Sequence, residues 1–238
     1  DFSFERNGTV FHVLKATGKL RLASFFWLDT FLIRRVCRAI QPDLVHAWGS
    51  EKGASLIASR LPYPYLVTIQ GLFAWLAQLV KLPPYDRFVE RVERISLNRA
   101  PVVTAESNFA VRFLETHFPR TKARQAEHAP NPVFRQVVRR PATRPIQFVC
   151  VGSLSYLKGT DLLFAALDRV GAELDFKLKI ITNPNLQYLT SLRGTISDRT
   201  WHRTEFKHHL LPHEVAEELA TATMLLMPTR ADNSPNAV

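Results

Sequence analysis

The chain has 238 residues, 46% of them hydrophobic, a formal net charge of +10 and only two cysteines. This apolar content can bury a sizeable core, which excludes an intrinsically disordered protein, and the length permits one large domain or two small ones. No run approaches the roughly 18 uninterrupted apolar residues of a transmembrane helix. The two cysteines lack metal-ligand spacing and are expected to be buried free thiols, which fits a reducing, cytoplasmic location.

The first part of the sequence alternates short β-rich runs with segments of helical period. Apolar residues at 3 and 4 spacing predict a helix that Pro42 ends, and Ser107 is predicted to cap a later helix. The predicted strands are 10–14, 44–48, 65–69 and 102–105, and the predicted helices are 28–40, 53–59, 88–95 and 107–117. Such alternation predicts a parallel sheet covered by helices.

The alternation stops after Asn131, where the stretch 135–145 carries four arginines and two prolines with little periodicity. We interpret this stretch as a linker between an α/β domain at 1–134 and a second at 146–238. In the second domain the predicted strands are 146–151, 176–182, 204–206 and 224–227, and the helices are 160–170, 184–193 and 212–220. A ligand is then expected in a cleft between the domains, at the carboxyl ends of the strands.

The loop after the strand 146–151 reads Gly-Ser-Leu-Ser-Tyr-Leu-Lys-Gly and leads into a predicted helix. Free backbone amides at a helix N-terminus favour an anion. Gly152 would let the backbone approach a ligand closely, and Lys158 would bring a cation to a diphosphate. A glycine turn followed by a solvated lysine gives the same pattern, so this loop alone leaves both interpretations open.

The tail after the strand 224–227 reads Pro-Thr-Arg-Ala-Asp-Asn-Ser-Pro-Asn-Ala-Val. It places the carboxylate of Asp232 and several small polar residues where a new helix would begin. Ordinary capping by Asp232 or Ser234, with Pro235 in the first turn, is the alternative explanation. Because loops after parallel strands converge on one edge, we expect Lys158 and Asp232 to lie at neighbouring strand ends and line one pocket.

Several segments in the same order resemble the family 4 glycosyltransferases, which have the GT-B fold. The segment 152–163 is similar to that family's Gly-Arg-Leu, three residues, Lys-Gly motif, and the tail resembles its Pro-Ser/Thr, then Glu-x7-Glu, motif. The segments 43–49, 67–71, 103–107 and 129–133 resemble further strand ends and the Pro-Asn-Gly-Val segment. The sequence departs from the family at Ser153 for an arginine, Gln70 for a histidine, Asp232 for a glutamate and His208 for a glycine.

The resemblance implies a GT-B arrangement of two Rossmann-like domains facing a cleft, with an acceptor-side first domain and a donor-binding second domain. It implies a retaining, hexosyltransferase-type enzyme of glycan biosynthesis that moves a sugar from a UDP- or GDP-type donor to the hydroxyl of a glycan or lipid-linked acceptor. No metal and no cofactor besides the donor co-substrate are implied. The implied catalytic residues are Lys158, Asp232 and His46; the donor residues are Gly152, Ser153, Lys158, Asn233, Ser234, Pro235 and Asn236; the acceptor-side residues are His46, Gly49, Gln70 and Gly71.

The sequence is expected to be an internal piece, truncated at both ends, with both domains incomplete and no activity alone. The family's first glycine-rich loop is missing, and its second acidic residue would fall beyond Val238. The arginine clusters favour an anionic partner, either an anionic substrate or the inner face of a membrane, and solvated helix faces explain the same clusters equally well. A GT-B-like sugar-nucleotide epimerase is an alternative, as is a basic nucleic-acid-binding module, although the arginines do not interleave with aromatics as a stacking platform requires.

Overall fold

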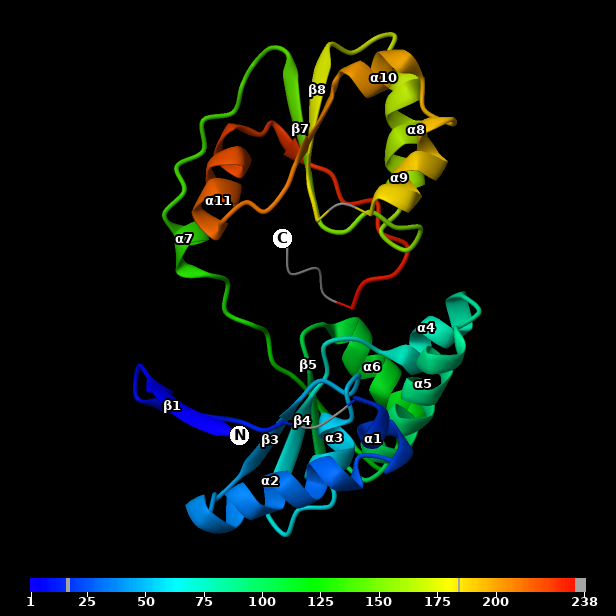
Figure 1. Cartoon of the computed structure of the whole chain (residues 1–238). Helices are drawn as coiled ribbons and strands as arrows, with labels where there is room; N and C mark the ends of the chain where they lie inside the picture. Colours follow the sequence, from blue (N-terminus) through cyan, green and yellow to red (C-terminus); the bar gives the residue numbers. More distant parts are fainter. Residues whose placement is uncertain (16–17, 184, 234–238) are drawn as a thin grey trace. The chain divides into compact units, whose positions relative to one another are not determined.

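The computed structural model describes residues 1–15, 18–183 and 185–233 and contains two compact units, Asp1–His128 and Ala129–Val238 (Figure 1). The division falls before the stretch 135–145 that the sequence analysis takes as a linker. The backbone amide of Arg140 donates to the Ala220 carbonyl at 2.7 Å, and that of Ala142 donates to Thr221 at 3.2 Å. The stretch is therefore held by backbone hydrogen bonds to the second unit.

The first unit contains a four-stranded parallel sheet in the order β3-β4-β5-β6 and a separate antiparallel hairpin of β1 and β2. Its strands are β1 (Phe2–Arg6), β2 (Thr9–Val13), β3 (Val45–Trp48), β4 (Tyr65–Thr68), β5 (Val102–Ala105) and β6 (Lys122–Gln125). Its helices are α1 (Gly18–Ala23), α2 (Trp27–Ile40), α3 (Ala54–Ala58), α4 (Phe73–Leu79), α5 (Pro84–Leu97) and α6 (Asn108–His117).

A row of small and β-branched side chains crosses one face of this first sheet. Ala47, Val67, Val103 and Ala123 are consecutive register partners on β3 to β6, and none is more than 4% exposed. They belong to one core with Leu97 of α5 and several side chains of α6. The row thus forms part of the helix-covered core that the predicted α/β fold requires.

The second unit contains a four-stranded parallel sheet in the order β10-β7-β8-β9. Its strands are β7 (Ile146–Val151), β8 (Phe176–Ile181), β9 (Thr204–Lys207) and β10 (Met224–Leu225). Its helices are α7 (Pro132–Arg135), α8 (Thr160–Val170), α9 (Leu186–Arg193), α10 (Asp198–His202) and α11 (Pro212–Thr221), the last with Pro212 in its first turn as predicted.

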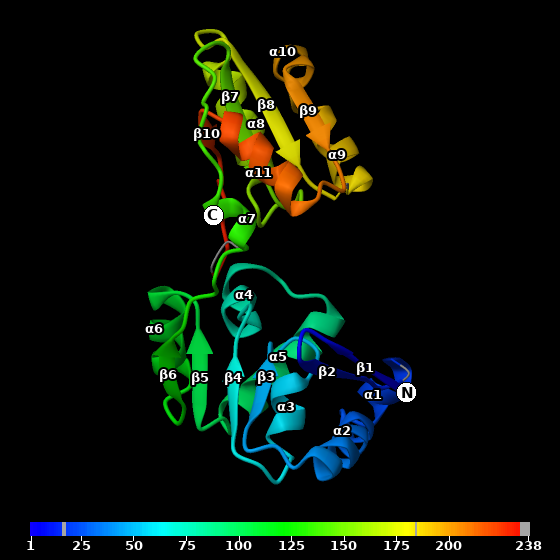
Figure 2. The same ribbon diagram turned by 90° about the vertical axis from the view of Figure 1, so that its left-hand side faces the viewer.

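Helices cover both faces of this second sheet (Figure 2). Phe148, Phe176 and Leu178 pack with side chains of α8, α9 and α10 on one face, while Val149 and Ile181 pack with α11 on the other. The parallel pairing of β10 with β7 brings the loops that follow these two strands to the same edge. That edge holds the residues described below.

Within the described residues, every helix is too short or too polar to cross a bilayer.

Candidate active site

Two loops of the second unit meet at the carboxyl ends of β7 and β10. The first, 152–159, carries Lys158, and the second, 226–233, carries Asp232. The Lys158 Nζ atom forms an ion pair with Asp232 Oδ2, and the two side chains are 36% and 13% exposed. The structure thus brings together the two residues that the sequence analysis expected at neighbouring strand ends.

Backbone contacts hold the two loops against each other. The amides of Arg230 and Ala231 both donate to the Leu157 carbonyl, at 2.8 and 3.3 Å. Gly159 has a φ of +67°, and a side chain at this position would overlap the Pro228 carbonyl. A glycine is therefore needed at 159 for the close approach of the second loop.

Local hydrogen bonds within the first loop fix the position of the Lys158 backbone. The amide of Lys158 donates to Ser155 Oγ at 3.2 Å, and the amide of Ser155 donates to Thr160 Oγ1 at 3.1 Å. Since Leu154 is only 2% exposed, the loop is also anchored by an apolar side chain. The lysine ammonium therefore extends from an ordered turn.

The remaining predicted donor residues differ in their surroundings. Gly152 has a φ of +138° and open space where a side chain would lie, and the neighbouring Ser153 is exposed. Asn233 is buried and has an interaction partner. Ser234, Pro235 and Asn236 lie outside the described residues.

The first turn of α8 is only partly open to an anion. The Thr160 amide donates to the Ser155 carbonyl at 3.3 Å, so it already has a partner inside the protein. Asp161 places a carboxylate in the same turn. This helix terminus therefore offers less to an anion than an unoccupied one would.

Arg230 and Asp161 form a contact that the sequence analysis missed. Two guanidinium nitrogens of Arg230 donate to the two carboxylate oxygens of Asp161 at 2.6 and 2.7 Å. The Arg230 side chain holds the pKa of Asp161 below its usual value. The available signals were an aspartate in the first turn of a predicted helix and an arginine two residues before Asp232.

In the first unit, His46 lies on β3 and is hydrogen-bonded sideways across the sheet. Its Nε2 atom lies 2.7 Å from Thr68 Oγ1, which in turn lies 2.6 Å from Thr104 Oγ1. The ring meets Trp48 edge to face at a centroid distance of 5.4 Å. His46 is thus held by the neighbouring strands, and its side chain is exposed.

The predicted acceptor-side residues Gly49, Gln70 and Gly71 follow β3 and β4. The Gly49 amide donates to the Thr68 carbonyl at 2.8 Å, and its φ of +82° suits glycine. The carboxylate of Glu51 occupies the space beside Gly49 and accepts a hydrogen bond from the Gly71 amide at 3.1 Å. Gln70 lies beside Gly49 as well, so the structure gathers these residues around one carboxylate.

A second carboxylate, Glu93 of α5, supports these same loops from inside the core. Although fully buried, it accepts hydrogen bonds from Ser50 Oγ at 2.6 Å and from the Phe73 and Ala74 amides at 3.2 and 2.8 Å. Burial raises the pKa of Glu93 to about 7. The signal in the sequence was a glutamate on the apolar side of the helix predicted at 88–95.

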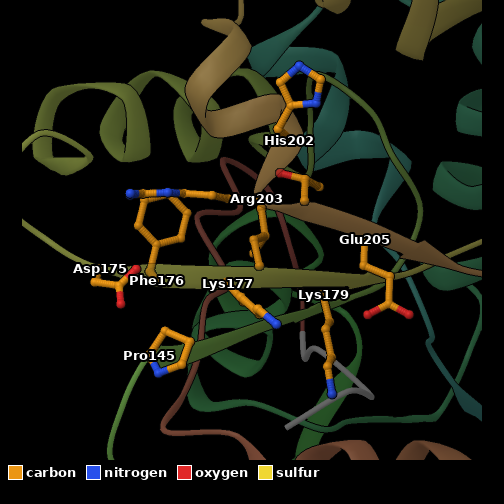
Figure 3. Close-up of a pocket in the computed structure, with 10 residues that line it drawn as sticks. Pro145, Asp175, Phe176, Lys177, Lys179, His202, Arg203 and Glu205 are labelled. Atoms are coloured by element: carbon orange, nitrogen blue, oxygen red, sulfur yellow. The ribbon is translucent and has the colours of Figure 1, made fainter.

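A pocket lies elsewhere in the second unit, around the starts of β8 and β9 (Figure 3). Its lining includes none of the predicted site residues. Arg203 stacks over Phe176 at 5.2 Å and donates to the Leu174 carbonyl at 2.8 Å, so it closes the loop before β8. In the part of the chain that the structure describes, no three His, Cys, Asp or Glu side chains are grouped as a metal site would require.

The fold of the chain is that of known sugar-transferring enzymes. Sucrose-phosphate synthase from Thermosynechococcus elongatus matches with a TM-score of 0.81 and 14% identity over 99% of this chain and 65% of that one. HepE of Anabaena, in complex with UDP and glucose, matches with a TM-score of 0.64 and 15% identity over 91% and 59%. A glycosyltransferase from Rickettsia africae matches with a TM-score of 0.63 and 14% identity over 91% and 58%.

The chain therefore spans about three fifths of the length of these structures. The likeness confirms the predicted α/β fold of GT-B type. No curated protein matches the chain by sequence. The model of Glycosyltransferase Family 4 matches residues 2–135, which is more than half of the chain. The chain belongs to Glycosyltransferase Family 4.

Proposed function

We propose that this protein transfers a sugar from a UDP- or GDP-type donor to an acceptor hydroxyl, with retention of the anomeric configuration, as a hexosyltransferase of glycan biosynthesis. The observation that carries the proposal is the meeting of Lys158 with Asp232 where the loops after β7 and β10 converge. A cation and a carboxylate at one strand edge suit a ligand that has both an anionic diphosphate and a hydroxyl-bearing sugar. In this proposal the second unit binds the donor, and the first unit binds the acceptor.

The chemistry follows from where charge develops during transfer. As the bond between the sugar's anomeric carbon and the diphosphate oxygen breaks, negative charge grows on the departing diphosphate, and the Lys158 ammonium stabilises that charge. The acceptor oxygen bonds to the same carbon, and its proton passes to the departing diphosphate. Asp232 orients the sugar by accepting hydrogen bonds from its hydroxyls, and Asn233 contributes from the same loop. The bound UDP and glucose of HepE, which shares the fold, support this class of donor.

The acceptor side rests on His46, Gly49, Gln70 and Gly71 of the first unit. Glu51 and Glu93 link the loops after β3 and β4, so the acceptor would meet a surface fixed by buried hydrogen bonds. A hydroxyl of a glycan or of a lipid-linked sugar suits these polar and backbone groups.

Exposed groups on α2 support a cytoplasmic protein that docks peripherally on a membrane. Trp27 and Phe31 are 57% and 66% exposed, and Arg35 and Arg38 on the same helix are exposed as well, whereas Arg34 is half-buried and donates to the Arg60 carbonyl at 3.2 Å. Aromatic and basic side chains together favour the surface of an anionic bilayer. Sedimentation of the full-length protein with phosphatidylserine vesicles, but not with phosphatidylcholine vesicles, would support docking, and no sedimentation with either would contradict it.

The test of the proposed function has two steps. In the first, the full-length protein is titrated with UDP- and GDP-linked sugars in a calorimeter, and we expect one donor class to bind with micromolar to millimolar affinity. In the second, a transfer reaction with that donor and an acceptor is run, and nuclear magnetic resonance reads the anomeric configuration of the product. Retention of the donor's anomeric configuration in the product is the predicted outcome. Failure of every nucleotide-sugar to bind would refute the proposal.

A further inference from the structure

Arg230 belongs to the second loop, which carries Asp232, and its side chain contacts the first loop, which carries Lys158. Besides its paired bonds to Asp161, one guanidinium nitrogen donates to the Tyr156 carbonyl at 2.7 Å. The guanidinium also stacks over the Tyr156 ring at 4.0 Å. One side chain from the second loop is thus hydrogen-bonded to both the first loop and the first turn of α8.

These contacts lie close in the sequence to both residues of the ion pair. Tyr156 and Leu157 immediately precede Lys158, while Arg230 stands two residues before Asp232. The Leu157 carbonyl accepts the amides of Arg230 and Ala231. Any shift of the Arg230 side chain therefore moves the backbone that carries the lysine relative to the backbone that carries the aspartate.

We infer that Arg230 and Asp161 are a positioning pair that sets the spacing of Lys158 and Asp232 for a nucleoside diphosphate. The inference rests on the proposed function, because it assigns those two residues to the donor. Arg230 itself is occupied by Asp161 and Tyr156, so it acts through the loops and not by touching the ligand. A lysine at 230 would keep the charge but lose the planar, two-bonded contact.

The same unit offers a matched control pair. Arg193 pairs with Asp198 and stacks over the Trp201 ring at 4.8 Å, so it repeats the combination of an ion pair and an aromatic contact. It joins the end of α9 to α10 and contacts neither of the two loops. Arg193→Lys therefore measures what the loss of such a contact does to the unit in general.

The experiment compares Arg230→Lys, Asp161→Asn and their double variant with Arg193→Lys in the full-length protein. Calorimetry measures the affinities for UDP and UMP, or for GDP and GMP if the protein binds guanine nucleotides. We expect each single variant to weaken diphosphate binding about tenfold. The affinity loss of the double variant should be smaller than the product of the two single losses, because both residues act through one contact. Arg193→Lys should stay within about twofold.

A purely structural role would weaken the diphosphate and the monophosphate equally. The positioning role predicts that the preference for the diphosphate over the monophosphate falls by about fivefold or more, in the same direction as in Lys158→Ala. An unchanged preference in both Arg230→Lys and Asp161→Asn would overturn the inference. Additive losses in the double variant would overturn it as well.

Hydrogen exchange of the Arg230 and Ala231 amides tests the pair without any ligand. Exchange at both amides should be at least about tenfold faster in Arg230→Lys than in Arg193→Lys, because the hydrogen bonds of these amides to the Leu157 carbonyl depend on the contacts of the Arg230 side chain with Asp161 and Tyr156. Unchanged exchange would overturn the inference even if nucleotides bind. Faster exchange in a protein that binds no nucleoside diphosphate would instead support the pair and refute the proposed function.

Discussion

Removing the Lys158 ammonium is the most informative single perturbation of the candidate donor site. Lys158→Ala deletes the cation that is proposed to meet the diphosphate and leaves the loop backbone in place, since that backbone is held by Ser155 and Leu157. The loss should therefore appear in the use of the donor and not in folding. It should be larger for the diphosphate-linked donor than for a nucleoside monophosphate.

The magnitude follows from the partner that Lys158 already has. A hydrogen bond to a charged phosphate contributes about 1.5 to 3 kcal/mol. Binding must first release the partly exposed pair with Asp232, and such pairs are worth only about 0 to 1 kcal/mol. The difference is roughly 0.5 to 3 kcal/mol, which corresponds to about a two- to more than hundredfold loss in kcat/KM for the donor.

The assay is steady-state sugar transfer by the full-length enzyme at varied donor concentration, with melting temperatures recorded for each variant. Lys179→Ala is the control, because Lys179 also pairs with a carboxylate, that of Glu218 at 2.7 Å, but lies within β8. A change of less than about twofold in kcat/KM for Lys158→Ala would refute the diphosphate role of this lysine.

Three further predictions test other parts of the account. Asp232→Asn frees Lys158, so calorimetry should give UDP affinity about two- to fivefold higher than that of the wild type, while sugar transfer falls; weaker UDP binding would contradict this. Gly159→Ala should lower the free energy of unfolding in urea by at least about 2 kcal/mol, because of its positive φ and the Pro228 carbonyl. Gly194→Ala, at a φ of −69° with open space, should change it by less than about 1 kcal/mol, and equal effects would refute the packing argument. Burial raises the folded pKa of Glu93 from 4.5 to about 7, so the folded state binds the extra proton and the free energy of unfolding falls as pH rises through that range. In Glu93→Gln this fall should be smaller by up to about 3 kcal/mol in total, and an identical pH dependence in the variant and the wild type would contradict the shift.

The strands and helices of the fold follow from periodicity where one face is buried. The row from Ala47 to Ala123 and the apolar stripes of the long helices made most elements readable in the sequence. The strand β6 was missed because only Ala123 of its four residues is buried, which leaves no alternating pattern. The strand β1 was missed although Asn7 and Gly8, with φ of 52° and 74°, form the Asn-Gly turn typical of a hairpin.

The candidate site was predictable only in part, because sequence motifs name the residues that face a ligand and not those that hold them. Lys158 and Asp232 were found from a motif resemblance and from the rule that parallel strands end at one edge. Arg230 and Glu93 act through contacts between segments far apart in the chain, so their partners emerge only from the fold. The pairing of the Thr160 amide with the Ser155 carbonyl could likewise not be read from the sequence alone.

The most direct test of the account is a crystal structure of the full-length protein with bound UDP. We predict that Lys158 releases Asp232 and that its ammonium lies within hydrogen-bonding distance of a diphosphate oxygen, with Arg230 still paired to Asp161. A nucleotide bound away from the carboxyl ends of β7 and β10, with the Lys158 and Asp232 pair intact, would contradict the account.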